Sequence, residues 1–226
     1  MNLTQQRSNL FKRGAGGLAL VALLLFAAPV LAQVASLGKG VLTLQLGRGA
    51  APVGGIATDL ADPAANASHD ILHGKAFRFS SGYHFAEQLS FEIGFGHLGT
   101  MTSSARYLAS DVLNVETSLF VIDADLVANI PVAPSARVDI TLGVAESALH
   151  STVRTQNGSA LPAGTNGGDN VRRLGVTAGL DLEWRISDVV SVLVGYHAYT
   201  HVGSPTLRDS ASGTATAILA GFRFEF

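Results

Sequence analysis

Apolar and polar residues alternate with a period of two along most of this chain, and this pattern limits the folds open to it. In residues 174–184, LGVTAGLDLEW, the apolar residues Leu174, Val176, Leu180 and Trp184 share one face, while Gly and acidic residues occupy the other. Successive side chains of a β-strand point to opposite faces, whereas a helix would repeat every 3.6 residues. The pattern therefore predicts strands with one apolar and one polar face.

The same alternation recurs along the chain and predicts eight strands. Besides 174–184, it covers a short first segment at 41–46 and six further segments: 77–85, 89–95, 122–130, 137–144, 191–197 and 218–226. No comparable helical periodicity competes with it, so the predicted fold class is all-β.

The connections between these segments alternate in length. Three are short, at 86–88, 131–135 and 187–189. Four are long and rich in Gly, Ala, Ser, Asn and Asp, at 49–73, 99–112, 154–171 and 203–213. Short turns at one end and long loops at the other are typical of transmembrane β-barrels. We therefore predict an eight-stranded antiparallel up-and-down transmembrane β-barrel with short periplasmic turns and four long extracellular loops.

A water-soluble barrel of the lipocalin type would show the same alternation with its faces reversed, and it is the alternative fold. Two features favour the membrane. The polar face combines Gly and small residues with Arg and carboxylates, as a narrow packed interior requires. In addition, Phe85, Trp184 and Phe226 stand at the turn-side ends of their strands, where an interfacial aromatic girdle would lie.

The N-terminal segment has the pattern of a secretory signal peptide. Arg7, Lys12 and Arg13 precede an apolar run, and small residues end it before Gln33. We predict a signal peptide at 1–32 and an outer-membrane β-barrel domain at 33–226, exported through the periplasm. Loss of the three cations changes the formal net charge from −2 to −5, so a nucleic-acid partner is not expected. The chain has no cysteine, which excludes disulfides and thiolate metal sites.

The C-terminal sequence AILAGFRFEF fits a closing strand. Phe222, Phe224 and Phe226 would face lipid, while Arg223 and Glu225 would face the interior. This strand must pair with the first, because an open sheet edge is not stable in hydrocarbon. A terminal strand ending on Phe also resembles the signal that outer-membrane proteins present to their assembly machinery.

The alternation places a set of charged side chains inside the barrel. An eight-stranded barrel is just wide enough for side chains to fill it, so these charges are expected to pair with one another. The alternative is a narrow passive pore that conducts when the ion pairs rearrange. The predicted interior charges are Arg78, Glu92, Asp123, Asp125, Arg137, Asp139, Arg173, Asp181, Glu183, Arg185, Arg223 and Glu225.

Two stretches resemble the OmpA-like and opacity-type outer-membrane β-barrel family. In FRFSSGYHFAEQLSFEIGFGHLG, residues 77–99, the family pattern corresponds to Gly82-Tyr83-His84-Phe85, Glu92, Gly94 and Leu98-Gly99. GVTAGLDLEWRISDVVSVLVGYHAY, residues 175–199, is similar to the sixth and seventh strands of the family. The resemblance implies a structural or surface-interaction role, such as adhesion, serum resistance or envelope integrity, with lipopolysaccharide, the assembly machinery and host surface molecules as partners.

Two chemical alternatives to this role are a lipid-modifying active site and a cation-binding site. Some barrels modify lipid A, and His197 and His201 beside Ser204 would be the candidate site, but the His-x-Ser-Asn pattern of deacylase barrels is missing. Acids and histidines in the first long loop suggest a cation site: Asp59, Asp62, His69, Asp70 and His73. A solvated loop accounts for them equally well. We expect no enzymatic activity, no metal site and no cofactor.

Overall fold

The computed structural model describes residues 39–62, 70–107, 111–162, 167–202 and 213–226. The predicted signal peptide, residues 1–32, lies outside this part of the chain. No helix within the described residues is long and apolar enough to cross a membrane.

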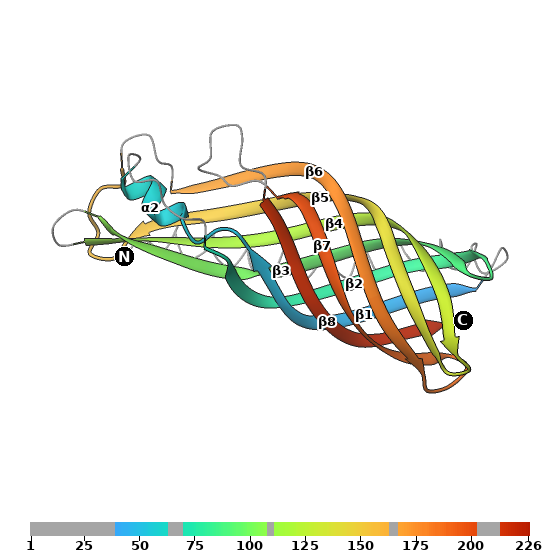
Figure 1. Ribbon diagram of the computed structural model, residues 1–226. Coiled ribbons are helices and arrows are strands. Elements are labelled where there is room, and N and C mark those ends of the chain that lie inside the picture. The colour runs from blue at the N-terminus through green and yellow to red at the C-terminus, as the bar shows by residue number, and fades with distance from the viewer. Residues whose placement is uncertain (1–38, 63–69, 108–110, 163–166, 203–212) are drawn as a thin grey trace, which may run out of the picture.

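Eight antiparallel strands form one closed barrel, in which each strand pairs with its sequence neighbours and β8 pairs with β1 (Figure 1). This confirms the predicted fold class. A single described helix, α2 (Ile56–Ala61), lies between β1 and β2. The strands are β1 (Gly40–Ala51), β2 (Leu72–Ala86), β3 (Leu89–Tyr107), β4 (Asp111–Ala133), β5 (Ala136–Thr155), β6 (Gly168–Arg185), β7 (Val190–Val202) and β8 (Gly213–Glu225).

The chain terminus completes the wall of the barrel. β8 runs antiparallel to β1 from the Val41–Glu225 pair to the Ala50–Thr216 pair. Beyond β8, the amide of Phe226 donates a hydrogen bond to the carbonyl of Gly40 at 3.0 Å, and Gly40 returns one at 2.7 Å. The last residue thus takes part in barrel closure, which leaves no open edge among the described strands.

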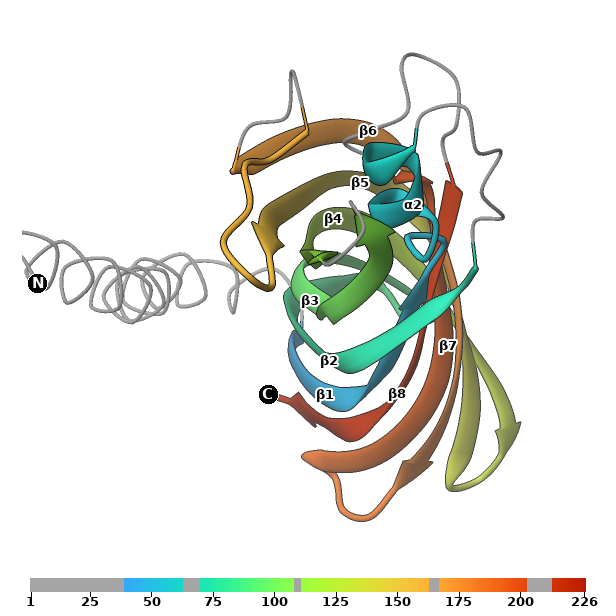
Figure 2. The ribbon, with the colours of Figure 1, turned by 90° about the vertical axis from the view of Figure 1, so that its left-hand side faces the viewer.

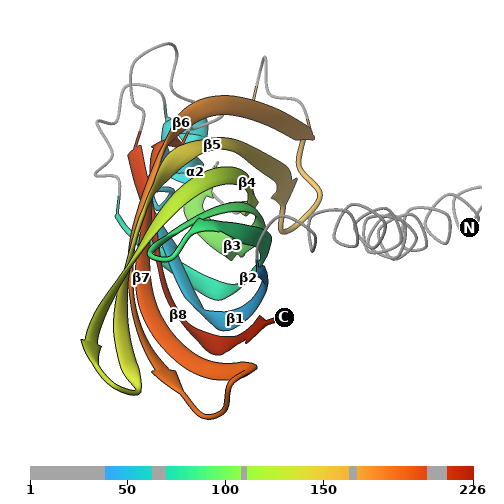
Figure 3. The same ribbon diagram turned by 90° about the vertical axis from the view of Figure 1, so that its right-hand side faces the viewer.

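The strands differ in length, and this shapes the molecule. A membrane crossing needs about 9–11 residues per strand, whereas β4 has 23 and β5 has 20. β3 to β6 continue past the ends of β7 and β8 on the side of α2 (Figure 1), and Figure 2 views this end of the barrel. The short turns and the C-terminus lie at the opposite end, viewed in Figure 3.

The second predicted loop is largely strand. Residues 99–107, expected as loop, continue β3 to Tyr107 and pair with the start of β4. Here the outward residues Thr100 and Thr102 are exposed, while Met101 and Ser103 between them are buried. The period of two therefore persists, but the apolar side has moved to the inside.

This exchange of faces is clearest on β5. In its periplasmic half Ile140 and Leu142 point outward, with 39% and 60% of their surfaces exposed, while Asp139 is fully buried inside. In its extracellular half the outward residues are polar except for Ala148, and the inward residue Leu149 is 1% exposed. The pairing of β5 with β4 and β6 runs through this change without a register shift. The strand therefore passes unbroken from one solvent environment to another.

We call the half with apolar outward residues the membrane band and the half with polar outward residues the extracellular column. In the membrane band the wall has the polarity of a transmembrane barrel, with polar groups inside. In the extracellular column it has the polarity of a water-soluble barrel, with an apolar core. On β4 the change lies between Leu119, which is buried inside, and Asp123, the next interior charge.

Candidate functional site in the barrel interior

Arg78 on β2 organises the upper part of the polar interior. Its Nη2 lies 2.8 Å from Asp123 Oδ1 and 2.7 Å from Asp125 Oδ2, both on β4. Its Nη1 donates to the hydroxyl of Ser80 at 3.3 Å, and that hydroxyl donates to Glu92 Oε2 at 2.8 Å. All five side chains are buried, so their charges are compensated by one another and not by water.

Arg223 on β8 forms the second centre, directly linked to the first through Glu92. Its Nη2 lies 2.8 Å from Glu92 Oε1, and its Nη1 contacts Asp139 and lies 2.9 Å from Glu183 Oε2. Its Nε donates to the Thr43 hydroxyl at 3.1 Å. One guanidinium thereby joins groups from β1, β3, β5 and β6 across the lumen, a use of its five donors that a lysine could not reproduce.

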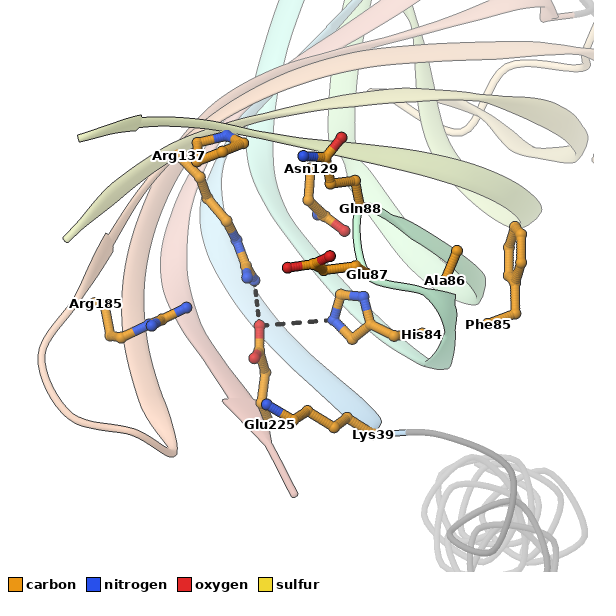
Figure 4. Close-up of a pocket in the computed structure, with 11 residues that line it drawn as sticks. Lys39, His84, Phe85, Ala86, Glu87, Gln88, Asn129, Arg137, Arg185 and Glu225 are labelled. Atoms are coloured by element: carbon orange, nitrogen blue, oxygen red, sulfur yellow. Dashed lines mark hydrogen bonds and ion pairs between the residues drawn. The ribbon is translucent and has the colours of Figure 1, made fainter. Parts of the chain in front are cut away.

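The network reaches the periplasmic mouth through Arg137. This side chain lies 2.9 Å from Glu183 and also contacts Glu225, whose Oε1 is 3.7 Å from His84 Nε2. Figure 4 shows Arg137, Glu225 and His84 at the wall of a pocket of about 480 Å³. Exposed Lys39 and Arg185 line the outer part of the pocket. The Arg137–Glu225 pair thus stands between this open pocket and the Arg223 centre.

The structure brings most of the predicted interior charges into this network, with two corrections. Arg173 and Arg185 are exposed, and neither has an ion-pair partner in the described part of the chain. Alternation assigns a face but not a height, and these two residues lie toward opposite ends of β6, beyond the packed interior. The charges within hydrogen-bond or ion-pair distance of one another, or of interior polar groups, are Arg78, Glu92, Asp123, Asp125, Arg137, Asp139, Asp181, Glu183, Arg223 and Glu225.

Three further polar side chains belong to the interior but were not in the predicted set of interior charges. Gln45 Nε2 donates to Asp181 Oδ1 at 2.8 Å, and His197 Nε2 lies 3.2 Å from Asp181 Oδ2. Asn129 Nδ2 donates to Asp139 Oδ1 at 2.7 Å. Alternation places all three on polar faces, so the sequence pattern contains this signal, but the predicted interior set consisted of charged side chains only. Without Arg173 and Arg185 the interior holds three arginines against seven carboxylates.

Above the ion pairs the interior becomes apolar. Leu98, Leu113, Leu119, Leu149 and Leu219 are each at most 1% exposed and belong to one hydrophobic cluster. These leucines come from β3, β4, β5 and β8, so the cluster spans the barrel from the top of the membrane band into the extracellular column. We call this set the apolar layer. Its side chains offer no polar groups to a hydrated ion or solute.

α2 covers the apolar layer at the extracellular end, where Figure 2 shows it at the mouth of the barrel. Ile56 and Ala57 are fully buried and belong to the same cluster as the leucines, and the Ala57 amide donates to the Ser103 hydroxyl at 3.2 Å. The first loop was expected to be a long connection, with its acids and histidines in a solvated segment. Residues 52–61 of this loop instead contribute apolar side chains to the core.

A conservative truncation tests this packing. Ile56→Val should destabilise the folded protein by about 0.5–1.5 kcal/mol, because it removes one buried methylene group. Ile71→Val is the matched control, since Ile71 is 62% exposed and should change stability little. Urea unfolding in detergent micelles, followed by tryptophan fluorescence, measures both. Equal effects would mean that α2 does not pack on the barrel.

Asp111 holds the loop between β5 and β6 at the far end of the extracellular column. Its Oδ1 accepts from the amides of Val112 at 2.8 Å and Asn157 at 2.9 Å, and its Oδ2 accepts from the Ser159 amide at 3.2 Å. A hydrogen bond from the Ser159 side chain, followed by these amides, lowers the pKa of Asp111 to about 2. The Asp111 carboxylate therefore holds the outward-facing loop between β5 and β6 in place.

This site predicts an acid-dependent loosening of the loop. Since the folded-state pKa is below the ordinary value of 3.8, the stabilisation is complete above about pH 4 and is lost as the pH falls toward 2. Hydrogen exchange at the amides of Asn157 and Ser159, corrected for the intrinsic rate, should accelerate through this window. Asp111→Asn should exchange fast at every pH. Protection that persists in that variant would contradict the assignment.

The structure describes only part of the residues of the two chemical alternatives. His197 is buried against Asp181, while His201 is exposed with its Nδ1 3.1 Å from the Thr200 hydroxyl. Ser204 and His69 lie outside the described residues. Within that part of the chain, no three His, Asp or Glu side chains gather to hold a metal ion.

A family model described as "Outer membrane protein beta-barrel domain" matches residues 18–226. Among solved structures, Neisserial surface protein A is similar with a TM-score of 0.52 and 16% identity, covering 84% of this chain and 97% of that one. The attachment invasion locus protein Ail of Yersinia pestis gives 0.45 and 11%, covering 83% and 99%. The N-terminal barrel of Pseudomonas aeruginosa OprF gives 0.45 and 8%, covering 84% and 98%. Curated proteins give no match.

Proposed function

This chain belongs to the outer-membrane β-barrel family, and we propose that within the outer membrane it serves as a closed barrel that presents a binding surface to the outside. The role would be adhesion, envelope integrity or host interaction through the extracellular column and loops. The observation that carries the proposal is the closure of the interior at two successive levels, by ion pairs in the membrane band and by the apolar layer above them.

The extracellular column supports a surface role. Its apolar core makes the extended strands rigid, and its outward residues are polar and exposed, such as Glu116 on β4 and His150 on β5. A pore would gain nothing from a hydrophobic core above the membrane, whereas a binding protein gains a stable support for its loops. Residues 156–162 between β5 and β6, which Asp111 anchors, are part of the surface so presented.

Single-channel recording in a planar bilayer separates this role from that of a narrow passive pore. We expect no steady openings for the wild-type protein, because the apolar layer excludes hydrated ions. Openings that change when Arg223 or Glu92 is replaced would favour the pore, and the excess of interior carboxylates would make it cation-selective. We propose that the protein does not act as an enzyme.

A cell-binding assay tests the surface role itself. Bacteria that display the wild-type protein should adhere to cultured epithelial cells better than bacteria that display a variant with residues 156–162 replaced by a Gly/Ser segment of equal length. A Gly/Ser segment replacing the periplasmic turn residues 134–135 is the control. Equal adhesion by all three, with all three barrels assembled, would argue against loop-mediated binding.

A further inference from the structure

Two cations lie side by side on the outer wall where the membrane band ends. Arg48 on β1 is paired directly with Lys75 on β2, and both side chains are exposed. Residues directly opposite in antiparallel strands have Cβ atoms about 4.5–5.5 Å apart, and like charges in such positions repel each other. His73, the next outward residue of β2, is also exposed. We call Arg48 and Lys75 the cation pair.

The surrounding wall offers the cation pair no carboxylate. β1 and β2 contain no acidic residue, and in β8 and β3 the acids are Glu225 and Glu92, which point inward. Neither Arg48 nor Lys75 has an ion-pair partner among the residues that the structure describes. Within the described residues, no protein carboxylate pairs with these two charges.

The position of the cation pair indicates what balances it. Directly below Arg48, toward the periplasm, Leu46 points outward with 71% of its surface exposed, followed by Leu44 with 49%. Ile218 on β8, paired with Arg48, is 62% exposed. These residues contact acyl chains in the membrane, so the cations stand at the height of the lipid headgroups of the outer leaflet.

The backbone at this corner is closely packed, which fixes the positions of the two strands that carry the cation pair. A β-carbon on Gly49 would lie 1.8 Å from the Leu98 carbonyl oxygen, so only glycine lets β1 approach β3 this closely. Gly99, beside a register shift in β3, has φ +121°, a conformation open to glycine and rarely to other residues. A two-cation site on a rigid wall loses less entropy on binding than one on mobile loops.

We propose that the cation pair binds the phosphate of a phosphorylated outer-leaflet lipid, of the lipid A class, whose acyl chains lie on Leu44, Leu46 and Ile218. Guanidinium and ammonium groups are suited to phosphate, and the apolar surface below distinguishes a lipid from free phosphate. This inference rests on the outer-membrane location and is independent of what the loops bind.

Arg172 on β6 provides the matched control. It is also exposed and outward-facing above an exposed leucine, Leu174, but its Nη1 lies 3.4 Å from Glu146 Oε1. Its charge is already balanced within the protein. Like Arg48→Gln, Arg172→Gln removes one positive charge from an exposed outward position. The difference is that Arg172 is already paired with Glu146, whereas Arg48 has no such partner among the described residues.

The test measures binding of lipid A in uncharged-detergent micelles by native mass spectrometry, for the wild type, Arg48→Gln, Lys75→Gln, the double variant and Arg172→Gln. We expect a loss of about fivefold for each single variant and about 25-fold for the double variant, from roughly 1 kcal/mol per cation near an anionic surface. Arg172→Gln should bind as the wild type does. Dephosphorylated lipid A should bind as weakly to the wild type as lipid A binds to the double variant.

Thermal melting gives a second readout that a purely structural role would not move. Without lipid A, Arg48→Gln should raise the melting temperature slightly, because the substitution relieves the repulsion between Arg48 and Lys75. With lipid A, the same substitution should lower the melting temperature, because the variant binds the lipid more weakly. Equal binding of dephosphorylated lipid A, an unchanged double variant, an equal loss in Arg172→Gln, or displacement of the lipid by millimolar inorganic phosphate would each overturn the proposal.

Discussion

Arg223→Leu is expected to destabilise the barrel by about 3–5 kcal/mol, the largest effect of any single change considered, because it leaves buried carboxylates without a counter-charge. Glu92, Asp139 and Glu183 all contact this one guanidinium, and each is at most 2% exposed. Water cannot replace the lost cation at that depth. The measurement is urea unfolding in lipid vesicles, monitored through Trp184, the only tryptophan of the chain.

Arg185→Leu is the matched control for this change. Arg185 is exposed at the periplasmic mouth and has no ion-pair partner in the described residues, so its loss should alter stability by less than about 0.5 kcal/mol. Arg223→Lys should fall between the two, since an ammonium group keeps the charge but cannot contact all three carboxylates at once. A loss below about 1 kcal/mol in Arg223→Leu would mean that the lumen is hydrated and that the interior is not closed by ion pairs.

Leu142→Arg should have the second largest effect, about 2–4 kcal/mol, because it places a charge on the lipid face near the middle of the membrane band. Leu142 is 60% exposed, so the cost arises from lipid and not from crowding. His150→Arg alters the same face of the same strand eight residues further on, in the extracellular column, where the side chain is exposed to water. It should change stability by less than about 0.5 kcal/mol. Unfolding in vesicles measures both, and equal costs would contradict the boundary between the two halves.

The alternation predicted the strands well because the period of two depends only on backbone geometry. It also placed Arg78, Glu92 and Arg223 on the inner face, where Glu92 pairs with Arg223 and is linked to Arg78 through the Ser80 hydroxyl. The ion-pair partners could not be predicted from the sequence. A contact between Arg223 on β8 and Asp139 on β5 depends on the barrel diameter and on the height of each residue in the wall.

The extracellular column could not be predicted by the same logic, because apolar residues were assigned to lipid throughout. Leu113, Leu119 and Leu149 keep the period of two, but they belong to the inward face, which is polar lower in the barrel. Where a strand passes from lipid to water, its apolar residues change from the outer to the inner face. In the sequence this change weakens the apolar–polar alternation, which is why residues 99–107 were expected as loop. The packing of α2 depends on this apolar layer and was missed with it.

One unbroken barrel changes its outer polarity near residue 145 of β5. The chain has no cysteine, so single cysteines can carry a spin label at outward positions of β5 without background. Power-saturation electron paramagnetic resonance in vesicles then compares collision with oxygen, which concentrates in lipid, and with a water-soluble nickel complex. Labels at 140, 142 and 144 should respond to oxygen, and labels at 146, 150 and 154 should respond to nickel. A response to oxygen along the whole series, or to nickel along the whole series, would contradict the claim.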